Sequence, residues 1–346
     1  VAFLFVLFGM SSSFGQVAQR GTATTATSTT TTITIAKPTG VVAGDIMLVS
    51  ISQTNTNTAA SLAGWNSIAN TTQNGGAPNR VYTVLYRIAT VGEPVNYTFT
   101  IAGDNNVGAI VAFSGVDNTT PIDVNGAFNN TNSTNANADA ITTTTTNSAV
   151  IMFASAAGTS PTWNTWTATT PATLNELFDT QNTTSSVGAA WATKATTGAT
   201  GAGGAISTVN NRKSAVLVAL RASVPPPAND LCSGATLITS NTTCTTTTGS
   251  TTGATDNNET GDCTTGAENA VWYQFQAVAT THVVTVDGIA GFDAVLQVLN
   301  TCGVAGNPTG GACIDATADD GIETRTLTGL TIGAFYKIQI HDYEGD

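Results

Sequence analysis

Two histidines occur in this 346-residue chain, and they limit the catalytic chemistry that it can carry. His282 and His341 fall in predicted strands, and no G-x-S-x-G nucleophile motif or H-E-x-x-H zinc motif accompanies them. We therefore interpret both as solvent-facing strand residues. Glycosidase chemistry needs paired carboxylates, but Glu93 and Glu176 are the only glutamates of the first half, and no E-x-D-x-E pattern occurs. The sequence predicts no catalytic centre.

Calcium is the one cofactor that the sequence suggests, because two loops are rich in Asp and Asn. Calcium takes roughly six to eight oxygen ligands, which such loops can supply. The candidate ligands in ATDNNETGDC and DATADDG are Asp256, Asn258, Asp262, Asp315, Asp319 and Asp320. Their spacing is not that of an EF-hand, and Asp, Asn and Gly also form ordinary turns by bonding their own backbone. Both interpretations stay open at this point.

Three tryptophans are placed where they could stack on the apolar face of a sugar. Trp65 in AGWNS, and Trp163 and Trp166 in PTWNTWTA, lie in or beside loop-like segments. The alternative is that these large rings close the ends of a hydrophobic core, which we favour for Trp65 and also for the Trp163 and Trp166 pair. Because polar residues separate Trp163 from Trp166, we expect that both rings cannot easily point inward.

All five cysteines follow the prolines at residues 225–227, and none has the C-x-x-C spacing of a zinc or redox site. Disulfides of an exported protein are the better interpretation. Cys302 and Cys313 enclose a short Gly/Pro-rich loop, and we predict that they pair. Among Cys232, Cys244 and Cys263 any pairing is possible, with Cys232 bonded to either of the others favoured, and one thiol is left over.

The apolar run VAFLFVLFGM at residues 1–10 is too short to span a bilayer but fits the h-region of a signal peptide. Ser13 and Gly15 are small residues at the −3 and −1 positions for cleavage before Gln16. We therefore predict a signal peptide over residues 1–15, cut short at its N-terminus, and a secreted or outer-surface location. An N-terminal core strand is the alternative. No later segment is long and apolar enough to cross a membrane.

Charge and composition exclude one class of partner and favour one class of fold. The formal charge is −12 with only ten Lys and Arg, so no basic surface is available for phosphates and we expect no nucleic-acid binding. Hydrophobic residues make up 41% of the chain, which is enough to form a core. The abundant Thr, together with Val and Ile, is branched at Cβ and favours an extended backbone.

Short apolar or alternating segments, separated by turn residues, run along the whole chain. GDIMLVSIS at residues 44–52 is a continuous apolar run, as expected for a strand covered on both sides. NYTFTI at residues 96–101 alternates and places Tyr97 and Phe99 on one face. Only TLNELF at residues 173–178 suggests a helical turn. The sequence therefore predicts an all-β fold of antiparallel β-sandwich, jelly-roll-like domains.

The three prolines at residues 225–227 mark a domain boundary, because proline donates no backbone hydrogen bond and favours an extended spacer. A chain of this length is also expected to form two domains. We predict a first sandwich over residues 17–222, a linker over 223–229 and a second sandwich over 230–346.

Two sets of motifs are similar to known units of secreted proteins. NDLCSGATLI, VWYQF, VVTVDG, FDAVLQVLNTCG and LTGLTIGAFYKIQIHDY follow one another over about residues 228–346. This succession resembles the bacterial pre-peptidase C-terminal domain of exported Bacteroidetes proteins, which implies a non-catalytic sandwich, here truncated before its last strand. IAKPTGVVAGDIMLVSI and FSGVDNTTPIDVNGA are similar to a β-sandwich unit of secreted and phage-tail-like proteins, without an activity attached.

Together these features predict a secreted or cell-surface protein that is not an enzyme and acts as an adhesin or in extracellular assembly. Its expected partners are extracellular glycans, other polymers or protein surfaces. The alternative is the accessory region of a larger exported peptidase or glycoside hydrolase. Self-association through an unpaired edge strand is a third possibility.

Overall fold

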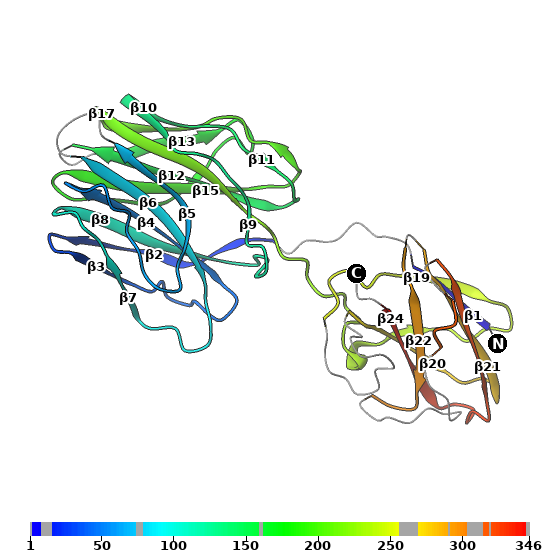
Figure 1. Ribbon diagram of the computed structural model, residues 1–346. Helices are drawn as coiled ribbons and strands as arrows, with labels where there is room; N and C mark the ends of the chain where they lie inside the picture. Colours follow the sequence, from blue (N-terminus) through cyan, green and yellow to red (C-terminus); the bar gives the residue numbers. More distant parts are fainter. Residues whose placement is uncertain are drawn as a thin grey trace. The chain divides into compact units, whose positions relative to one another are not determined.

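The computed structural model describes the backbone of residues 2–7, together with residues 16–73, 79–158, 162–255, 269–289, 291–302, 314–317 and 320–343. The chain divides into two compact units (Figure 1). The first unit comprises Phe14–Ser223, and the second comprises Val1–Ser13 and Val224–Asp346. Among the described residues all helical structure is one short 3-10 turn, Cys232–Gly234, and the rest of the regular structure is strand. The predicted all-β fold class is confirmed.

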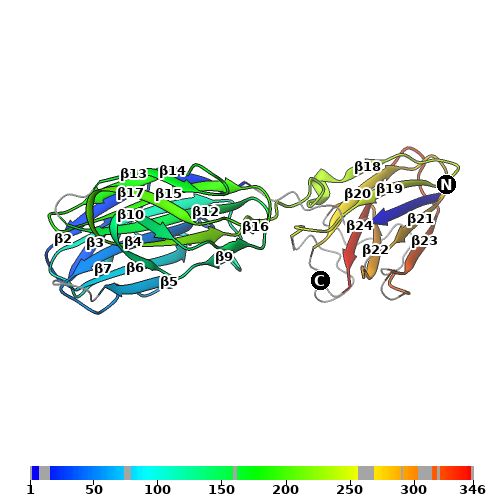
Figure 2. The same cartoon turned by 90° about the horizontal axis from the view of Figure 1, so that it is seen from above.

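Two large antiparallel sheets pack against each other in the first unit (Figure 2). One has the order β2-β8-β4-β6-β5, formed by Ala18–Ser28, Asn106–Ser114, Ile46–Thr54, Arg80–Ile88 and Asn66–Gln73. The other has the order β10-β17-β12-β15-β14, formed by Asn129–Ala138, Gly203–Leu220, Ser148–Ala157, Ser185–Lys194 and Asn175–Gln181. Strands β9 (Ile122–Asn125) and β13 (Trp163–Ala168) also pair with β17. The short pairs are β3–β7 (Thr32–Ala36, Asn96–Thr100) and β11–β16 (Thr142–Thr143, Gly198–Ala199).

The central strands of both sheets are covered on both faces, as the apolar run at residues 44–52 predicts. Leu48 of β4 and Ile151 of β12 belong to the core between the sheets. Met47, next along β4, packs instead with the inward side chains of the β3–β7 pair. Met152 of β12 packs with β10 and β13 on the outside of the other sheet. Three apolar layers therefore alternate with the sheets, which explains why antiparallel strands read as continuous apolar runs.

The segment at residues 173–178 is a strand and not the helical turn that its sequence suggests. Most of it belongs to β14, which pairs with β15, and the register shifts between Glu176 and Phe178. A bulge of this kind lets two successive side chains reach one face. Leu177 and Phe178 accordingly both lie in the core between the sheets. Two neighbouring apolar residues that face the same side do not fit the alternation of a regular strand, which is why the sequence suggests a helical turn here.

Two four-stranded sheets form the second unit. One has the order β19-β1-β21-β23, formed by Thr245–Gly249, Ala2–Leu7, Thr281–Asp287 and Ile322–Thr328. The other has the order β18-β20-β24-β22, formed by Thr236–Ile238, Val271–Gln276, Phe335–Asp342 and Ala294–Leu299. Val284 and Leu327 from the first sheet and Phe275 and Ile338 from the second share one core.

Part of the predicted signal peptide forms a strand of this second unit. Residues 2–7 are β1, which runs parallel to both of its neighbours, β19 and β21 (Figure 2). This arrangement corresponds to the alternative of an N-terminal strand. Ser13 and Gly15 of the predicted cleavage site lie outside the described residues.

The prediction that both histidines face solvent is wrong, because His282 and His341 are fully buried. His282 shares the inner face of β21 with Val284 and lies beside Phe275, with 5.1 Å between the ring centroids. Burial lowers the pKa of His282. His341 Nδ1 lies 3.0 Å from the carbonyl oxygen of Asp342. The strand assignments themselves did not reveal which face carries each ring.

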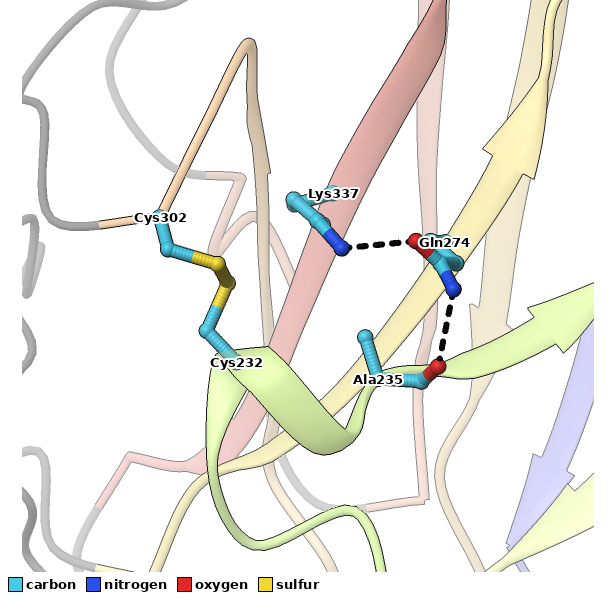
Figure 3. Close-up of a disulfide and its surroundings, with 5 residues drawn as sticks. All are labelled: Cys232, Ala235, Gln274, Cys302 and Lys337. Carbon is cyan, nitrogen blue, oxygen red and sulfur yellow. Dashed lines mark hydrogen bonds between the residues drawn. A yellow bond between two sulfur atoms is a disulfide. The ribbon is translucent and has the colours of Figure 1, made fainter.

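The disulfide of the second unit joins Cys232 to Cys302, with the two Cα atoms 5.7 Å apart (Figure 3). The predicted Cys302–Cys313 bond is therefore wrong, as is a bond from Cys232 to Cys244 or Cys263. Cys244 is free and exposed. Cys263 and Cys313 lie outside the described residues.

Packing around Trp272 explains this pairing across 70 residues of sequence. Trp272 and Leu299 form a small core with both half-cystines, so the end of β22 is brought against the 3-10 turn. Beside it, Lys337 Nζ donates to Gln274 Oε1 at 2.6 Å, and Gln274 Nε2 donates to the carbonyl oxygen of Ala235 at 3.2 Å (Figure 3). Closeness in the sequence did not predict which cysteines pair, because the pairing of the strands, and not the length of the loop between two cysteines, sets the distance between their Cα atoms.

Candidate functional site

Trp163 and Trp166 are buried, with 5% and 4% of their surface exposed, and their ring centroids lie 5.6 Å apart. The expectation that both rings cannot point inward is wrong for a local reason. The pairing of β13 with β17 shifts register between Asn164 and Thr167, and Thr165 has a φ of 52°. The extra residue of this bulge turns both rings to the same side of the strand.

Hydrogen bonds fix both indoles inside the first unit. Trp163 Nε1 donates to Ser186 Oγ at 3.0 Å, and Trp166 Nε1 donates to Glu176 Oε2 at 2.9 Å. Gly188 provides the space beside the rings, since a Cβ there would lie 2.7 Å from Trp163 Cδ1. Because the rings are covered and their N–H groups are satisfied, this pair belongs to the core and presents no stacking face.

Trp65 differs from this pair because it lines a cavity of about 390 Å³ in the first unit. The cavity lies where the residues before β5 meet the loop between β6 and β7. Its walls include Leu62, Trp65, Arg87, Glu93, Pro94 and Tyr97. Apolar, aromatic and charged groups therefore meet at one place, which is the usual composition of a small-molecule site.

The Trp65 ring is held on edge by two aromatic side chains of β7. Its centroid lies 5.1 Å from those of both Tyr97 and Phe99, in edge-to-face geometry. Only 8% of the residue is exposed, yet its Nε1 has no hydrogen-bond partner. Buried indole N–H groups normally find an acceptor. Because this nitrogen is itself covered, Trp65 contributes ring surface, and not its N–H group, to the wall of the cavity.

The opposite wall is an ion pair between Arg87 and Glu93. Arg87 Nη2 lies 2.8 Å from Glu93 Oε1, and Arg87 Nε lies 3.1 Å from both carboxylate oxygens. The backbone N–H and the hydroxyl of Thr90 donate to Glu93 Oε1 at 2.8 and 2.9 Å. The Tyr97 hydroxyl donates to Glu93 Oε2 at 2.5 Å. Five donor groups thus hold one carboxylate in place.

These contacts determine the charge of the site. Burial acts to raise the pKa of Glu93, but the hydrogen bonds from Arg87, Tyr97 and Thr90 outweigh it and lower the pKa to about 2. Burial and the hydrogen bond to Glu93 raise the pKa of Tyr97. A carboxylate with so low a pKa is ionised at neutral pH and is unsuited to general-acid catalysis, which needs a raised pKa. The wall is fixed and ionic, as a binding surface requires.

Gly64 allows Arg87 to approach the cavity closely. The residue has a φ of +79°, and a Cβ at this position would lie 2.4 Å from Arg87 Nη1. The same guanidinium nitrogen donates to the carbonyl oxygen of Gly64 at 3.2 Å. Glycine is favoured here by its backbone conformation, and the missing Cβ leaves room for the guanidinium group of Arg87.

The loop that carries Glu93 also presents apolar side chains to solvent. Val91 is 92% exposed and Val95 is 76% exposed, on either side of the carboxylate in the sequence. Exposed aliphatic groups beside a polar cavity are common where a protein contacts a partner.

A second cavity of about 550 Å³ has a wall of Thr, Ser, Asn and Gln side chains from the turn after β2 and the loop after β14. It offers neither rings nor charges, so it is the weaker candidate.

The described part of the predicted calcium loops does not assemble a metal site. Asp315 is exposed, and Asp320 Oδ1 accepts a hydrogen bond of 2.8 Å from the backbone of Gly291. Asp320 therefore acts as a turn residue, the alternative that its composition left open. The remaining candidates, Asp256, Asn258, Asp262 and Asp319, lie outside the described residues. No group of His, Cys, Asp and Glu placed to hold a metal occurs in the described segments.

Comparison with known proteins identifies no family for this chain. No family model matches it, and no curated protein sequence is similar to it. A solved structure, described as "The Triple Jelly Roll Fold and Turret Assembly in an Archaeal Virus", is 10% identical and covers 94% of this chain and 88% of its own, with a TM-score of 0.19. That score is too low to carry an argument about function. Among the described residues, no helix has the length and apolarity needed to cross a membrane.

Proposed function

We propose that this chain is a non-catalytic binding protein of the secreted or cell-surface class, and that it contacts an extracellular glycan at the Trp65 cavity. The observation that carries the proposal is the cavity in which the Trp65 ring meets the Arg87–Glu93 pair. The single disulfide among the described residues is compatible with export, since disulfides persist in oxidising compartments.

The chemistry of the cavity matches a sugar better than a purely apolar or purely ionic ligand. Hydroxyl groups both donate and accept hydrogen bonds, so a sugar can accept one from Arg87, whose side chain keeps 24% of its surface exposed. The aliphatic side chains of Leu62 and Pro94 can cover the C–H groups of the same ring. The charges are already paired, so a neutral ligand does not have to displace a counter-ion.

A glycan screen followed by titration calorimetry on the full chain tests this proposal. Trp65→Phe keeps an aromatic ring but removes part of the indole surface that lines the cavity, and it is expected to weaken binding about tenfold, which corresponds to roughly 1.4 kcal/mol. Trp272→Phe is the matched control, because it changes a buried tryptophan of the second unit and should leave affinity unchanged. Equal affinities of wild type and Trp65→Phe would exclude the cavity as the binding site.

A second candidate function is the accessory region of a larger exported hydrolase. The observation in its favour is the similarity of residues 228–346 to a domain that is appended to secreted peptidases. The coding sequence after residue 346 discriminates the two: a peptidase or glycosidase domain there supports the accessory role, whereas further sandwich modules support adhesion.

A further inference from the structure

One sheet of the second unit is continuous only because β1 is part of it. In the order β19-β1-β21-β23, β1 lies between two strands that do not pair with each other. The parallel register joins residues 3–7 to Thr245–Gly249 on one side and residues 2–6 to Val283–Asp287 on the other. Among the described residues, β1 is the only strand that pairs with β19.

The two strands that flank β1 define what kind of segment fits between them. His282, Val284 and Val286 of β21 are buried on its inner face and belong with the core of the second unit or lie against it. The strand β19 reads TTTTG and has no charged side chain. The slot therefore favours an uncharged, extended segment with apolar residues on one face, and the side-chain period of two fixes its register.

The segment that fills this slot is also the one whose sequence predicts a signal peptide. Removal of residues 1–15 on export would leave the backbone groups of β21 on that side, and those of β19, without the ladder that β1 provides. Unpaired groups on a strand edge readily accept another strand, whose main chain gives affinity and whose alternate side chains give specificity.

We propose that the slot between β19 and β21 is an acceptor for an added β-strand. In the exported protein its occupant is an extended apolar peptide segment of a partner, about six residues long and parallel to β21, the geometry that residues 2–7 show. The second unit then acts as a peptide-binding module, separate from the Trp65 cavity of the first unit.

The experiment compares the chain from residue 16 to 346 with the full chain. The probe is a fluorescent peptide of residues 1–8, VAFLFVLF, made soluble by a C-terminal Lys-Gly tail. Fluorescence anisotropy should show 1:1 binding to the shorter chain and at least tenfold weaker binding to the full chain, whose slot is occupied. Amide hydrogen exchange should show new protection within Thr245–Gly249 and Val283–Asp287, the residues that β1 pairs with, and nowhere else.

The matched control is the same peptide with Phe5→Pro, which stays apolar but loses a backbone donor in mid-strand and should bind at least tenfold less tightly.

Three results would overturn the proposal. The first is equal binding of the proline peptide. The second is full protection, in the shorter chain without peptide, of those β21 amides that face β1 and not β23. The third is protection that rises with protein concentration, which would make a second copy the occupant. None of them bears on glycan binding at Trp65.

Discussion

At the scale of single residues, Glu93 is expected to make the stability of the first unit depend on pH in the acidic range. Its pKa is about 2 in the folded chain, against an ordinary value of 4.5. The folded state therefore binds fewer protons than the unfolded state, so the stabilisation is complete above about pH 4.5 and is lost as the pH falls towards 2.

The variant Glu93→Gln tests this linkage. We expect it to lower the free energy of unfolding at pH 7 by roughly 2 kcal/mol, because it leaves the partly buried Arg87 without its counter-ion. Its melting temperature should also fall less steeply than that of wild type between pH 4.5 and 2. Asp315→Asn, at an exposed position of the second unit, should preserve the wild-type slope. A slope unchanged in Glu93→Gln would contradict the assignment.

Thr165 tests the bulge that turns both tryptophans inward. It holds a φ of 52° although it is β-branched, a conformation that costs free energy for every residue except glycine. Thr165→Gly should therefore raise the free energy of unfolding by about 1 kcal/mol. Thr167→Gly, two residues along the same strand, lacks this strain and should lower it. Denaturant titration of the two variants should give shifts of opposite sign.

The sequence predicted which kinds of residue a binding site could use better than it predicted which particular residues lie together. The sequence offers Trp65 as one of three candidate stacking residues while favouring a core position for it, and the structure places it both among buried side chains and in the wall of the cavity. The pairing of Arg87 with Glu93 could not be predicted, because it depends on where the hairpin between β6 and β7 places two side chains six residues apart. The Trp163–Trp166 pair shows the same limit, since a single bulge decides whether it is a platform or a core.

At the scale of strands, burial on both faces makes a quantitative prediction for β4. Ile46 packs in the core between the sheets and Ile51 packs under the β3–β7 pair, and both are fully buried. Truncation of either to Ala should therefore destabilise the first unit by a similar amount, roughly 2–5 kcal/mol. Thr34→Ala, on the exposed face of β3, is the control and should change stability by less than about 0.5 kcal/mol. A small effect of Ile51→Ala would show that the β3–β7 pair is not a true layer.

Strands were the part of the fold that the sequence predicted best. The run at residues 44–52 and the alternation at residues 96–101 have the burial that their patterns indicate. The errors came from irregular places, such as the bulge in β14, and from pairings between distant segments. Neither leaves a periodic signal, because both depend on contacts that a local window of sequence does not contain.

At the scale of the whole molecule, each unit has its own core, and we expect calorimetry to resolve two unfolding transitions. Cys302→Ser opens a loop of 70 residues in the second unit and should lower the stability of that unit by roughly 2–5 kcal/mol. The transition of the first unit should not move. Glu93→Gln provides the reciprocal control, since it should shift only the first. A single transition that moves with both variants would show that the units unfold together.

The length of β17 has a consequence for how the protein is made. This 18-residue strand is the last of the first unit, and β9, β10, β12 and β13, all synthesised before it, pair with it. The larger sheet cannot form until β17 has left the ribosome, which requires synthesis beyond residue 220. Translation itself therefore delays completion of the larger sheet until nearly all residues of the first unit are available.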